Sequence, residues 1–194
     1  AGATFLGDTG LWFVPTAEIL GHATFSASGQ RANFDREQGF TDIQHYLGTF
    51  AVGVQDRAEI FGSFRALTRI DRDLRPLFRP ALSRVGGVVS DYPLATDGFS
   101  GNEVGDFILG AKINLLSEER LNPAALAIRG LVKLPTGDEE AGTTTGEIDG
   151  EVDIIVSKAA GNVEVAGFGG FAFRSDPSNV DLPNGLRWGF GVGA

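Results

Sequence analysis

The sequence predicts an all-β protein, an antiparallel up-and-down transmembrane β-barrel with about eight or nine strands in this chain. Three observations support this fold class: long stretches that alternate apolar and polar residues, connections that alternate between short and long, and the lack of an apolar run that could form a membrane helix. Alternation with period two is typical of strands, and a tilted membrane strand needs about 9 to 11 residues. We treat residues 1–194 as a single β-barrel domain, either complete or the N-terminal part of a longer barrel.

Eight stretches carry the alternation, and the first two are less regular than the rest. They are residues 22–34, 42–55, 57–69, 105–115, 124–134, 151–158, 163–174 and 185–194. Because successive side chains of a strand point to opposite faces, strict alternation predicts that Ile108 points inward. The same rule sends a set of large apolar residues outward: Phe64, Leu109, Ile128, Ile154, Phe171 and Trp188.

The connections alternate in length along the chain. Short turns are expected near residues 55–57, 117–123 and 159–162, and long loops at 30–41, 71–104, 135–150 and 175–184. Outer-membrane barrels have short periplasmic turns and long extracellular loops. A further short stretch, Leu11–Pro15, would make a ninth strand, and the sequence ends at Gly193–Ala194 without the terminal aromatic residue that bacterial barrels usually carry. We therefore expect a barrel that continues beyond this sequence. The alternative is a complete eight-stranded barrel filled by its own side chains.

Composition narrows the classes of function. The formal net charge of -9 argues against a nucleic-acid partner, because binding phosphates needs clustered Lys and Arg. The chain has no cysteine, so disulfides and a cysteine nucleophile are excluded. We expect no cofactor, a location in the bacterial outer membrane, and outer-membrane lipid as the main partner, with other envelope proteins as further candidates.

If the apolar face meets lipid, the opposite face lines the interior and carries charges of both signs. Charges removed from water must be paired or hydrated. The predicted lumen-lining charges are Glu59, Arg65, Arg69, Asp106, Lys112, Arg129, Lys133, Glu151, Asp153, Glu164, Arg174 and Arg187.

Other motifs are weaker. The acidic loop formed by Asp138, Glu139, Glu140, Glu147 and Asp149 is interpreted as a solvated loop, with a divalent-cation site as the alternative. Residues 71–92 mix Arg and Leu. They form either a surface or interfacial segment, which meets lipid headgroups or folds into the lumen, or an ordinary long loop. The glycines at 167, 169 and 170 lie within a strand, where they allow curvature or aromatic packing.

Catalysis has little support in the sequence. His22 and His45 are the two histidines, and His45 with Asp42 is the one His–carboxylate pair close in sequence. No HExxH or equivalent metal motif is present. We therefore expect a protein that is not an enzyme and holds no metal.

Two groups of residues resemble known families. Thr9-Gly10-Leu11, followed by Pro15-Thr16-Ala17 and Gly21, resembles the start of barrels in OmpA-family and YjbH-like outer-membrane proteins. The stretch from Val132 to Asp138, then a Gly- and Thr-rich loop and Ser157-Lys158, is similar to meta-pathway (phenol degradation) outer-membrane transporters. These resemblances imply an outer-membrane location and either a passive pore or an envelope-anchoring role. The peptidoglycan-binding domain of OmpA proteins is not in this sequence, which leaves the anchoring role without its binding domain.

Three functions therefore remain open. The first is a passive outer-membrane pore or transporter, comparable to a porin. The second is a small filled barrel with a structural or partner-binding role in the envelope. The third is a soluble all-β binding module, in which the apolar face would point inward.

Overall fold

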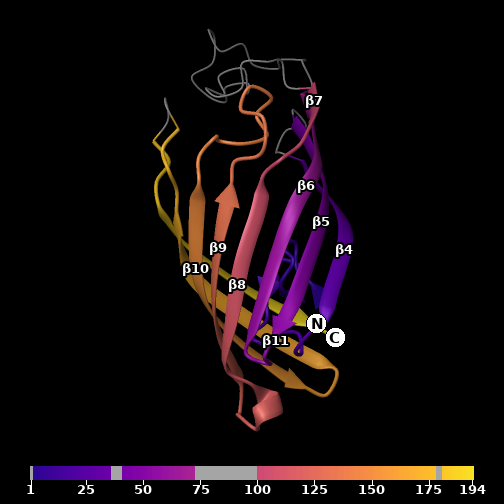
Figure 1. Cartoon of the computed structure of the whole chain (residues 1–194), viewed down its shortest axis with the longest axis vertical. Helices are drawn as coiled ribbons and strands as arrows, with labels where there is room; N and C mark the ends of the chain where they lie inside the picture. The colour runs from indigo at the N-terminus through magenta and orange to yellow at the C-terminus, as the bar shows by residue number, and fades with distance from the viewer. Residues whose placement is uncertain (1, 36–40, 73–99, 178–180) are drawn as a thin grey trace.

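The computed structural model describes residues 2–35, 41–72, 100–177 and 181–194. In these ranges the chain forms one antiparallel sheet whose eight long strands are neighbours in the order of the sequence, and Figure 1 shows how they run side by side. The strands are β4 (Phe25–Asp35), β5 (Thr41–Val54), β6 (Ala58–Arg72), β8 (Phe107–Leu116), β9 (Ala125–Leu134), β10 (Asp149–Ala160), β11 (Val163–Phe173) and β12 (Gly185–Gly193). The short β7 (Ser100–Glu103) also pairs with β6. The predicted all-β, antiparallel, up-and-down fold class is confirmed.

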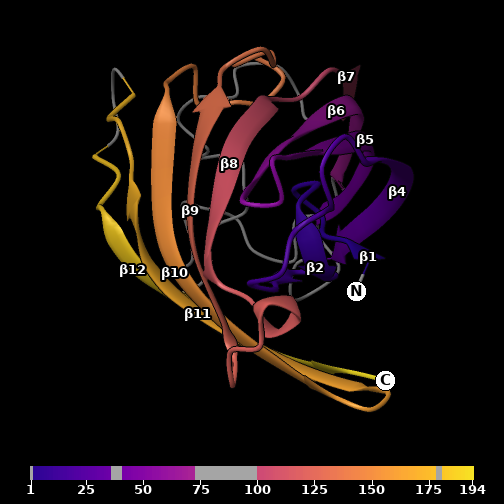
Figure 2. The ribbon, with the colours of Figure 1, turned by 60° about the horizontal axis from the view of Figure 1, so that its bottom comes forward.

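The sheet is strongly curled, so it resembles part of a barrel wall (Figure 2). Its two edge strands are β4 and β12, which stand at opposite ends of the strand order. The eight predicted strand ranges agree with the observed strands to within a few residues.

The two faces of the sheet differ in chemistry, as the alternation predicts. Along β8 the burial alternates residue by residue, with Ile108 buried on the concave face and its neighbour Leu109 exposed on the convex face. The same pattern leaves Ile154 58% exposed and Trp188 82% exposed. The predicted inward orientation of Ile108 is thus confirmed, and the convex face is a broad apolar surface.

The connections separate by length, as predicted. The turns that follow β5, β8 and β10 are short and lie at one end of the sheet, whereas the longer β9–β10 connection lies at the other end (Figure 1). The β8–β9 turn contains a single 3-10 turn, Glu118–Arg120, which Ser117 caps by accepting a hydrogen bond from the backbone of Glu119. We call these the short-turn end and the long-loop end. The loop predicted at 30–41 is shorter than expected, because β4 continues to Asp35 and β5 begins at Thr41. Residues 36–40, and residues 73–99 of the connection predicted at 71–104, lie outside the described residues.

No helix among the described residues is long and apolar enough to cross a membrane.

The chain begins on the concave side of the sheet. Residues 2–20, here called the inner segment, include the small three-stranded sheet β1 (Gly2–Ala3), β2 (Thr9–Leu11) and β3 (Val14–Pro15). Figure 2 shows β1 and β2 in indigo inside the curve of the large sheet. The inner segment contacts β4 on one side and β11 and β12 on the other, so it bridges the two edge regions.

The prediction that Leu11–Pro15 forms a ninth barrel strand is wrong. The chain reverses at Trp12, whose φ is 50°, and residues 9–11 pair with residues 14–15 in a separate sheet. Pro15 has no backbone N–H, so it suits the edge of a small sheet better than a central barrel strand. The stretch is a hairpin inside the curled sheet rather than a part of its wall.

The inner segment packs closely against the wall. Ala17 is fully buried with Ala125, Ala127 and Ile155, and small side chains at these positions let the backbones approach. Gly7 has a φ of 107°, and a Cβ at this position would lie 2.5 Å from the backbone oxygen of Gly62. Only glycine fits there without strain.

Candidate functional site

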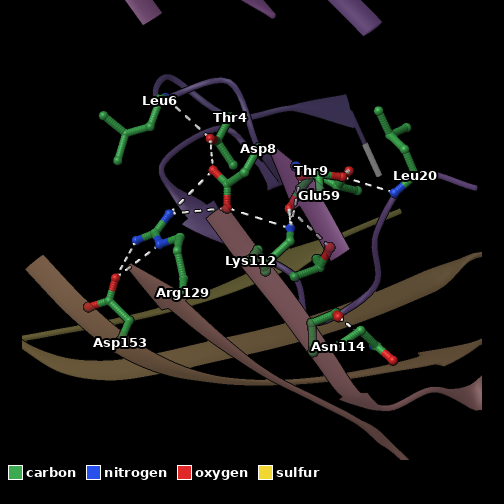
Figure 3. Close-up of polar contacts among 12 residues, drawn as sticks. Thr4, Leu6, Asp8, Thr9, Leu20, Glu59, Lys112, Asn114, Arg129 and Asp153 are labelled. Atoms are coloured by element: carbon green, nitrogen blue, oxygen red, sulfur yellow. Dashed lines mark hydrogen bonds and ion pairs between the residues drawn. The ribbon is translucent and has the colours of Figure 1, made fainter. Parts of the chain in front are cut away.

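A network of buried charges joins the inner segment to the wall, and Asp8 is at its centre (Figure 3). The Asp8 carboxylate accepts hydrogen bonds from Nη1 of Arg129 at 3.2 and 3.3 Å and lies 3.5 Å from Nζ of Lys112. It also accepts a short hydrogen bond from the hydroxyl of Thr4. None of the charged side chains here is more than 1% exposed. Asp8 is therefore the counter-ion of two wall cations.

Glu59 of β6 forms the second half of the network. Its carboxylate accepts hydrogen bonds from the backbone N–H of Thr9 at 2.8 Å and of Leu20 at 2.9 Å, and it lies 3.4 Å from Nζ of Lys112. Nζ of Lys112 in turn donates to the backbone oxygen of Thr9 at 2.8 Å. Glu59 and Lys112 thus satisfy backbone groups of the inner segment that are cut off from water, as buried polar groups require.

The wall extends the network toward β12. Nη2 of Arg129 donates to Oδ2 of Asp153 at 2.7 Å, and Nε of Arg187 lies 3.4 Å from Oδ1 of the same carboxylate. Arg187 also pairs with Glu151. The ring of Phe168 lies 5.7 Å from the Arg129 guanidinium and 5.2 Å from that of Arg187, which is cation–π distance.

Carboxylates outnumber cations in the fully buried part of this group. Two buried cations, Lys112 and Arg129, face three buried carboxylates, which are Asp8, Glu59 and Asp153, and the partly exposed Arg187 contacts both Asp153 and Glu151. Burial acts to raise the pKa of Asp8, but Lys112 and Arg129 lower it more, so its pKa lies below the ordinary value of 3.8. Asp8 is consequently ionised near neutral pH, and it is the one carboxylate of the inner segment that contacts both buried wall cations.

Uncharged contacts hold the rest of the inner segment. The backbone N–H of Ala17 donates to Oγ of Ser157 at 3.0 Å, and Nδ2 of Asn114 donates to the Ala17 oxygen at 2.7 Å. Glu18 accepts hydrogen bonds from the hydroxyl of Ser117 and the backbone N–H of Glu118, both at 2.8 Å. The segment is therefore tied to the wall from Thr4 to Leu20 and closes the concave side near the short-turn end.

A cavity of about 420 Å³ lies on the other side of the inner segment, toward the long-loop end. The inner segment contributes the side chains of Phe5, Trp12 and Phe13, and the wall contributes residues of β6 and β8 to β12. Charged and aromatic side chains both line this cavity, whereas the network near the short-turn end consists of buried charged and polar groups in contact with one another.

Comparison with protein families gives one match. Residues 72–190, more than half of the chain, match the family described as "Putative MetA-pathway of phenol degradation". The chain belongs to this family. Comparisons with curated proteins and with solved structures gave no match. Membership in the family and the curled antiparallel sheet together fit an outer-membrane β-barrel protein.

The match places the two sequence resemblances differently. The stretch Val132–Asp138 and the pair Ser157-Lys158 lie within the region that matches the phenol-degradation family, so the resemblance to that family is confirmed. The Thr9–Gly21 motif lies before the matched region, and its resemblance to OmpA-family and YjbH-like proteins stays a prediction. In the structure residues 9–20 of this motif form the second part of the inner segment, with Gly10 packed against Thr4, Val14 and Pro15.

In this family member most of the predicted lumen-lining charges lie on the concave side. The network holds Glu59, Lys112, Arg129, Asp153 and Arg187. The cavity is lined by Arg65, Lys133, Glu151, Arg174 and Arg187. Asp106 is buried 3.8 Å from Lys133. Glu164 is half-buried at the short-turn end of β11, away from both groups.

Arg69 is placed differently from its prediction. The pairing of β5 with β6 shifts between Tyr46 and Leu47, which pair with Leu67 and Arg65, so Ala66 is an extra residue in β6. A bulge of this kind reverses the alternation beyond it. Thr68 is therefore the buried residue and Arg69 is exposed.

Sequence reasoning missed Asp8, which the structure places at the centre of the site. The interior charges were predicted from the alternating stretches, and Asp8 precedes all of the long strands. The available signal was the resemblance at Thr9–Gly21, because Asp8 directly precedes this stretch.

The remaining candidates lie outside the network. Nδ1 of His45 is 3.1 Å from the hydroxyl of Thr68, and Nδ1 of His22 accepts a hydrogen bond from the backbone of Gln55. The Asp42 side chain and most of residues 71–92 lie outside what the structure describes. Among the described residues, no group of three or more His, Cys, Asp or Glu side chains is arranged to hold a metal ion.

Within the acidic loop, Asp149 pairs with Lys133 at 2.6 Å, and Asp138 accepts a hydrogen bond from the backbone of Ala141. In the strand glycines, a Cβ at Gly170 would lie 2.2 Å from Oδ1 of Asp153, whereas Gly169 faces open space. Gly170 is thus required for the packing of a network carboxylate rather than of an aromatic ring.

Proposed function

We propose that this protein is a non-enzymatic outer-membrane β-barrel that lets small solutes pass passively, and that the inner segment narrows their route. The observation that carries the proposal is the contrast between the two faces of the sheet. Large apolar side chains such as Ile154 and Trp188 are exposed on the convex face, while the charges lie on the concave face. In water this arrangement would be inverted, because exposed apolar area is unfavourable. In a bilayer it is the expected one.

The family description indicates which kind of solute to expect. It names the degradation of phenol, and we extend this to the chain by proposing a small organic solute. The proposed partner of the convex face is outer-membrane lipid, and contacts with other envelope proteins would fall at the loops and turns. The proposal includes no cofactor. It includes no nucleic acid, because the formal net charge of -9 does not favour binding to phosphates.

Lipid imposes a further requirement on the edges. Unpaired backbone N–H and C=O groups of β4 and β12 cannot face hydrocarbon, where each would cost several kcal/mol. We therefore propose that both edges are covered in the membrane, by pairing with each other or with further strands. The inner segment contacts both edge regions from the concave side of the sheet.

The orientation gives a direct test in intact cells. Glu140 lies in the β9–β10 connection, and Asn162 lies in the turn between β10 and β11. We expect Glu140→Cys to react with an impermeant thiol reagent and Asn162→Cys to be protected until the outer membrane is permeabilised. The native chain has no cysteine to interfere. Labelling at 162 but not at 140 would reverse the orientation, and a folded, monodisperse, detergent-free monomer would refute the membrane location.

A filled barrel with a structural role is the second candidate. It is favoured by the dehydration of the network, in which Asp8, Lys112 and Glu59 are fully buried. Conductance of the reconstituted protein in planar bilayers separates the two functions. Discrete conductance steps support passage of solutes, whereas a bilayer that stays closed despite correct insertion supports the structural role.

A further inference from the structure

The cavity beside the inner segment has an aromatic side. Phe5, Trp12 and Phe13 approach it from the inner segment, and Phe168 and Phe173 approach it from β11. The Phe5 and Phe13 rings are 5.5 Å apart, and those of Trp12 and Phe13 are 5.7 Å apart. Even so, Trp12 and Phe13 each remain about half exposed. Rings at these separations would accept a further ring by stacking or edge-to-face contact.

Basic side chains outnumber acidic ones in the lining of the cavity. Four basic side chains line it, against two acidic ones, which are Asp149 and Glu151. Lys133 is paired with Asp149, and Arg187 is paired with Glu151. The two other basic residues are Arg65 and Arg174. The buried Asp106 is a charged neighbour of Arg65, so these groups together keep one positive charge in excess.

Arg65 has an unused donor at this place. Its Nε atom is buried and has no hydrogen-bond partner among the described residues. Asp106 is a charged neighbour of Arg65 but does not accept from this atom. A buried donor without an acceptor is costly, and in native structures such a group indicates a role. Arg65 also lines the cavity, so its side chain would meet an oxyanion that entered it.

We propose that this cavity binds a small aromatic anion: a molecule with one planar ring and one carboxylate or similar oxyanion. The ring packs against Phe5, Trp12 and Phe168, and the oxyanion is held by Arg65. The volume of about 420 Å³ lies within the range of small-molecule sites. A cationic ligand would meet the excess positive charge, and an aliphatic acid would lose the contacts between rings. The site deepens the proposed function and rests on it, because the cavity would lie on the solute's route.

Intrinsic fluorescence provides the test. The chain has two tryptophans, Trp12 in the cavity and Trp188 on the convex face. In a Trp188→Phe background, Trp12 is the sole reporter. We expect sodium benzoate to change its emission saturably in the detergent-solubilised full chain. Cyclohexanecarboxylate, which lacks the aromatic ring, and benzylamine, which has the opposite charge, should bind at least about tenfold more weakly.

Variants locate the anion. We expect Arg65→Gln to weaken benzoate binding by about tenfold or more, because a charge-assisted hydrogen bond is lost. Arg31→Gln is the matched control: Arg31 is an exposed arginine on β4 that bonds to Gln44, and its replacement should leave binding unchanged. Arg174→Gln, at the exposed rim of the cavity, should weaken binding less and provides a second variant if Arg65→Gln does not fold.

Three results would overturn the proposal: no saturable change with folded protein, equal binding of benzylamine, or unaltered binding in the folded arginine variants of the cavity. The measurement needs no membrane and no conductance. It can therefore fail while solute passage is observed in bilayers, and it can succeed while the bilayer stays closed, so failure of the site and failure of the proposed function are distinguishable.

Discussion

The two ends of the concave side are built from the same alternating strands but have opposite character. Near the short-turn end the inner segment inserts Asp8 between Arg129 and Lys112, and every charge there has a partner at hydrogen-bond or ion-pair distance. Toward the long-loop end the same segment presents Phe5 and Trp12, and a cavity remains. The inner segment, rather than the wall, decides whether a region is closed or open, because it supplies a carboxylate to one and rings to the other.

The difference also concerns water. In the closed region the charges are paired and dehydrated, so removing one partner leaves another charge stranded. At the cavity the charged side chains are partly exposed, as for Lys133 at 15% and Arg187 at 24%. A variant should therefore cost much more stability in the first region than in the second.

The largest effect is expected for Arg129→Ala. This change leaves Asp8 and Asp153 buried without their shared cation, and we expect a loss of about 3–5 kcal/mol in the free energy of unfolding. Urea unfolding in detergent micelles measures it, with the exposed Arg31→Ala as the control that should change little. A loss below about 1 kcal/mol, accompanied by altered ion selectivity in bilayers, would mean that the network is hydrated and the comparison is wrong.

A smaller effect is expected for Gly7→Ala, which tests the close packing of the inner segment. The added Cβ would meet the backbone oxygen of Gly62, and the φ of 107° is unfavourable for alanine. We expect a loss of about 1–3 kcal/mol. Gly29→Ala in β4 is the matched control, because a Cβ there has nothing within 4 Å. Equal stability of the two variants would show that the segment is loosely held.

The contribution of ionised Asp8 to the free energy of unfolding should appear in its pH dependence. Because its pKa in the folded protein is lowered below 3.8, its ionised form stabilises the fold above that pH, and this contribution is lost as the pH falls through the lowered folded value. The difference in unfolding free energy between the native chain and Asp8→Asn should be constant near neutral pH and shrink in acid below pH 3.8. A difference that grows in acid would contradict this assignment of charge.

The smallest effect is expected at the surface. Glu118 accepts a hydrogen bond from the backbone of Ala159 and pairs with Lys158 at 3.0 Å, and these contacts lower its pKa. The pair lies in solvent, where salt screens it. We expect Glu118→Gln to leave the unfolding free energy nearly unchanged, with any residual difference disappearing in about 1 M salt. A salt-resistant loss comparable to that of Arg129→Ala would show that the turn belongs to the network.

The sequence predicted the wall well and the interior incompletely. The inward position of Ile108 and the outward positions of Leu109 and Trp188 followed from alternation alone. The outward position of Arg69 did not follow from alternation. The extra residue at Ala66 is a feature of strand pairing, and it cannot be recognised in the alternating pattern of the sequence. Asp8 was missed because it belongs to none of the alternating stretches.

By itself, the sequence determined the strands, their order and the chemistry of their two faces, because a period of two is a local property of neighbouring residues. The tertiary structure alone decided which charges meet. Asp8 and Arg129 are 121 positions apart, and their contact depends on the curl of the sheet and on the reversal of the chain at Trp12. Such contacts arise only when the inner segment lies inside the wall, where the loss of water requires every buried charge to have a partner.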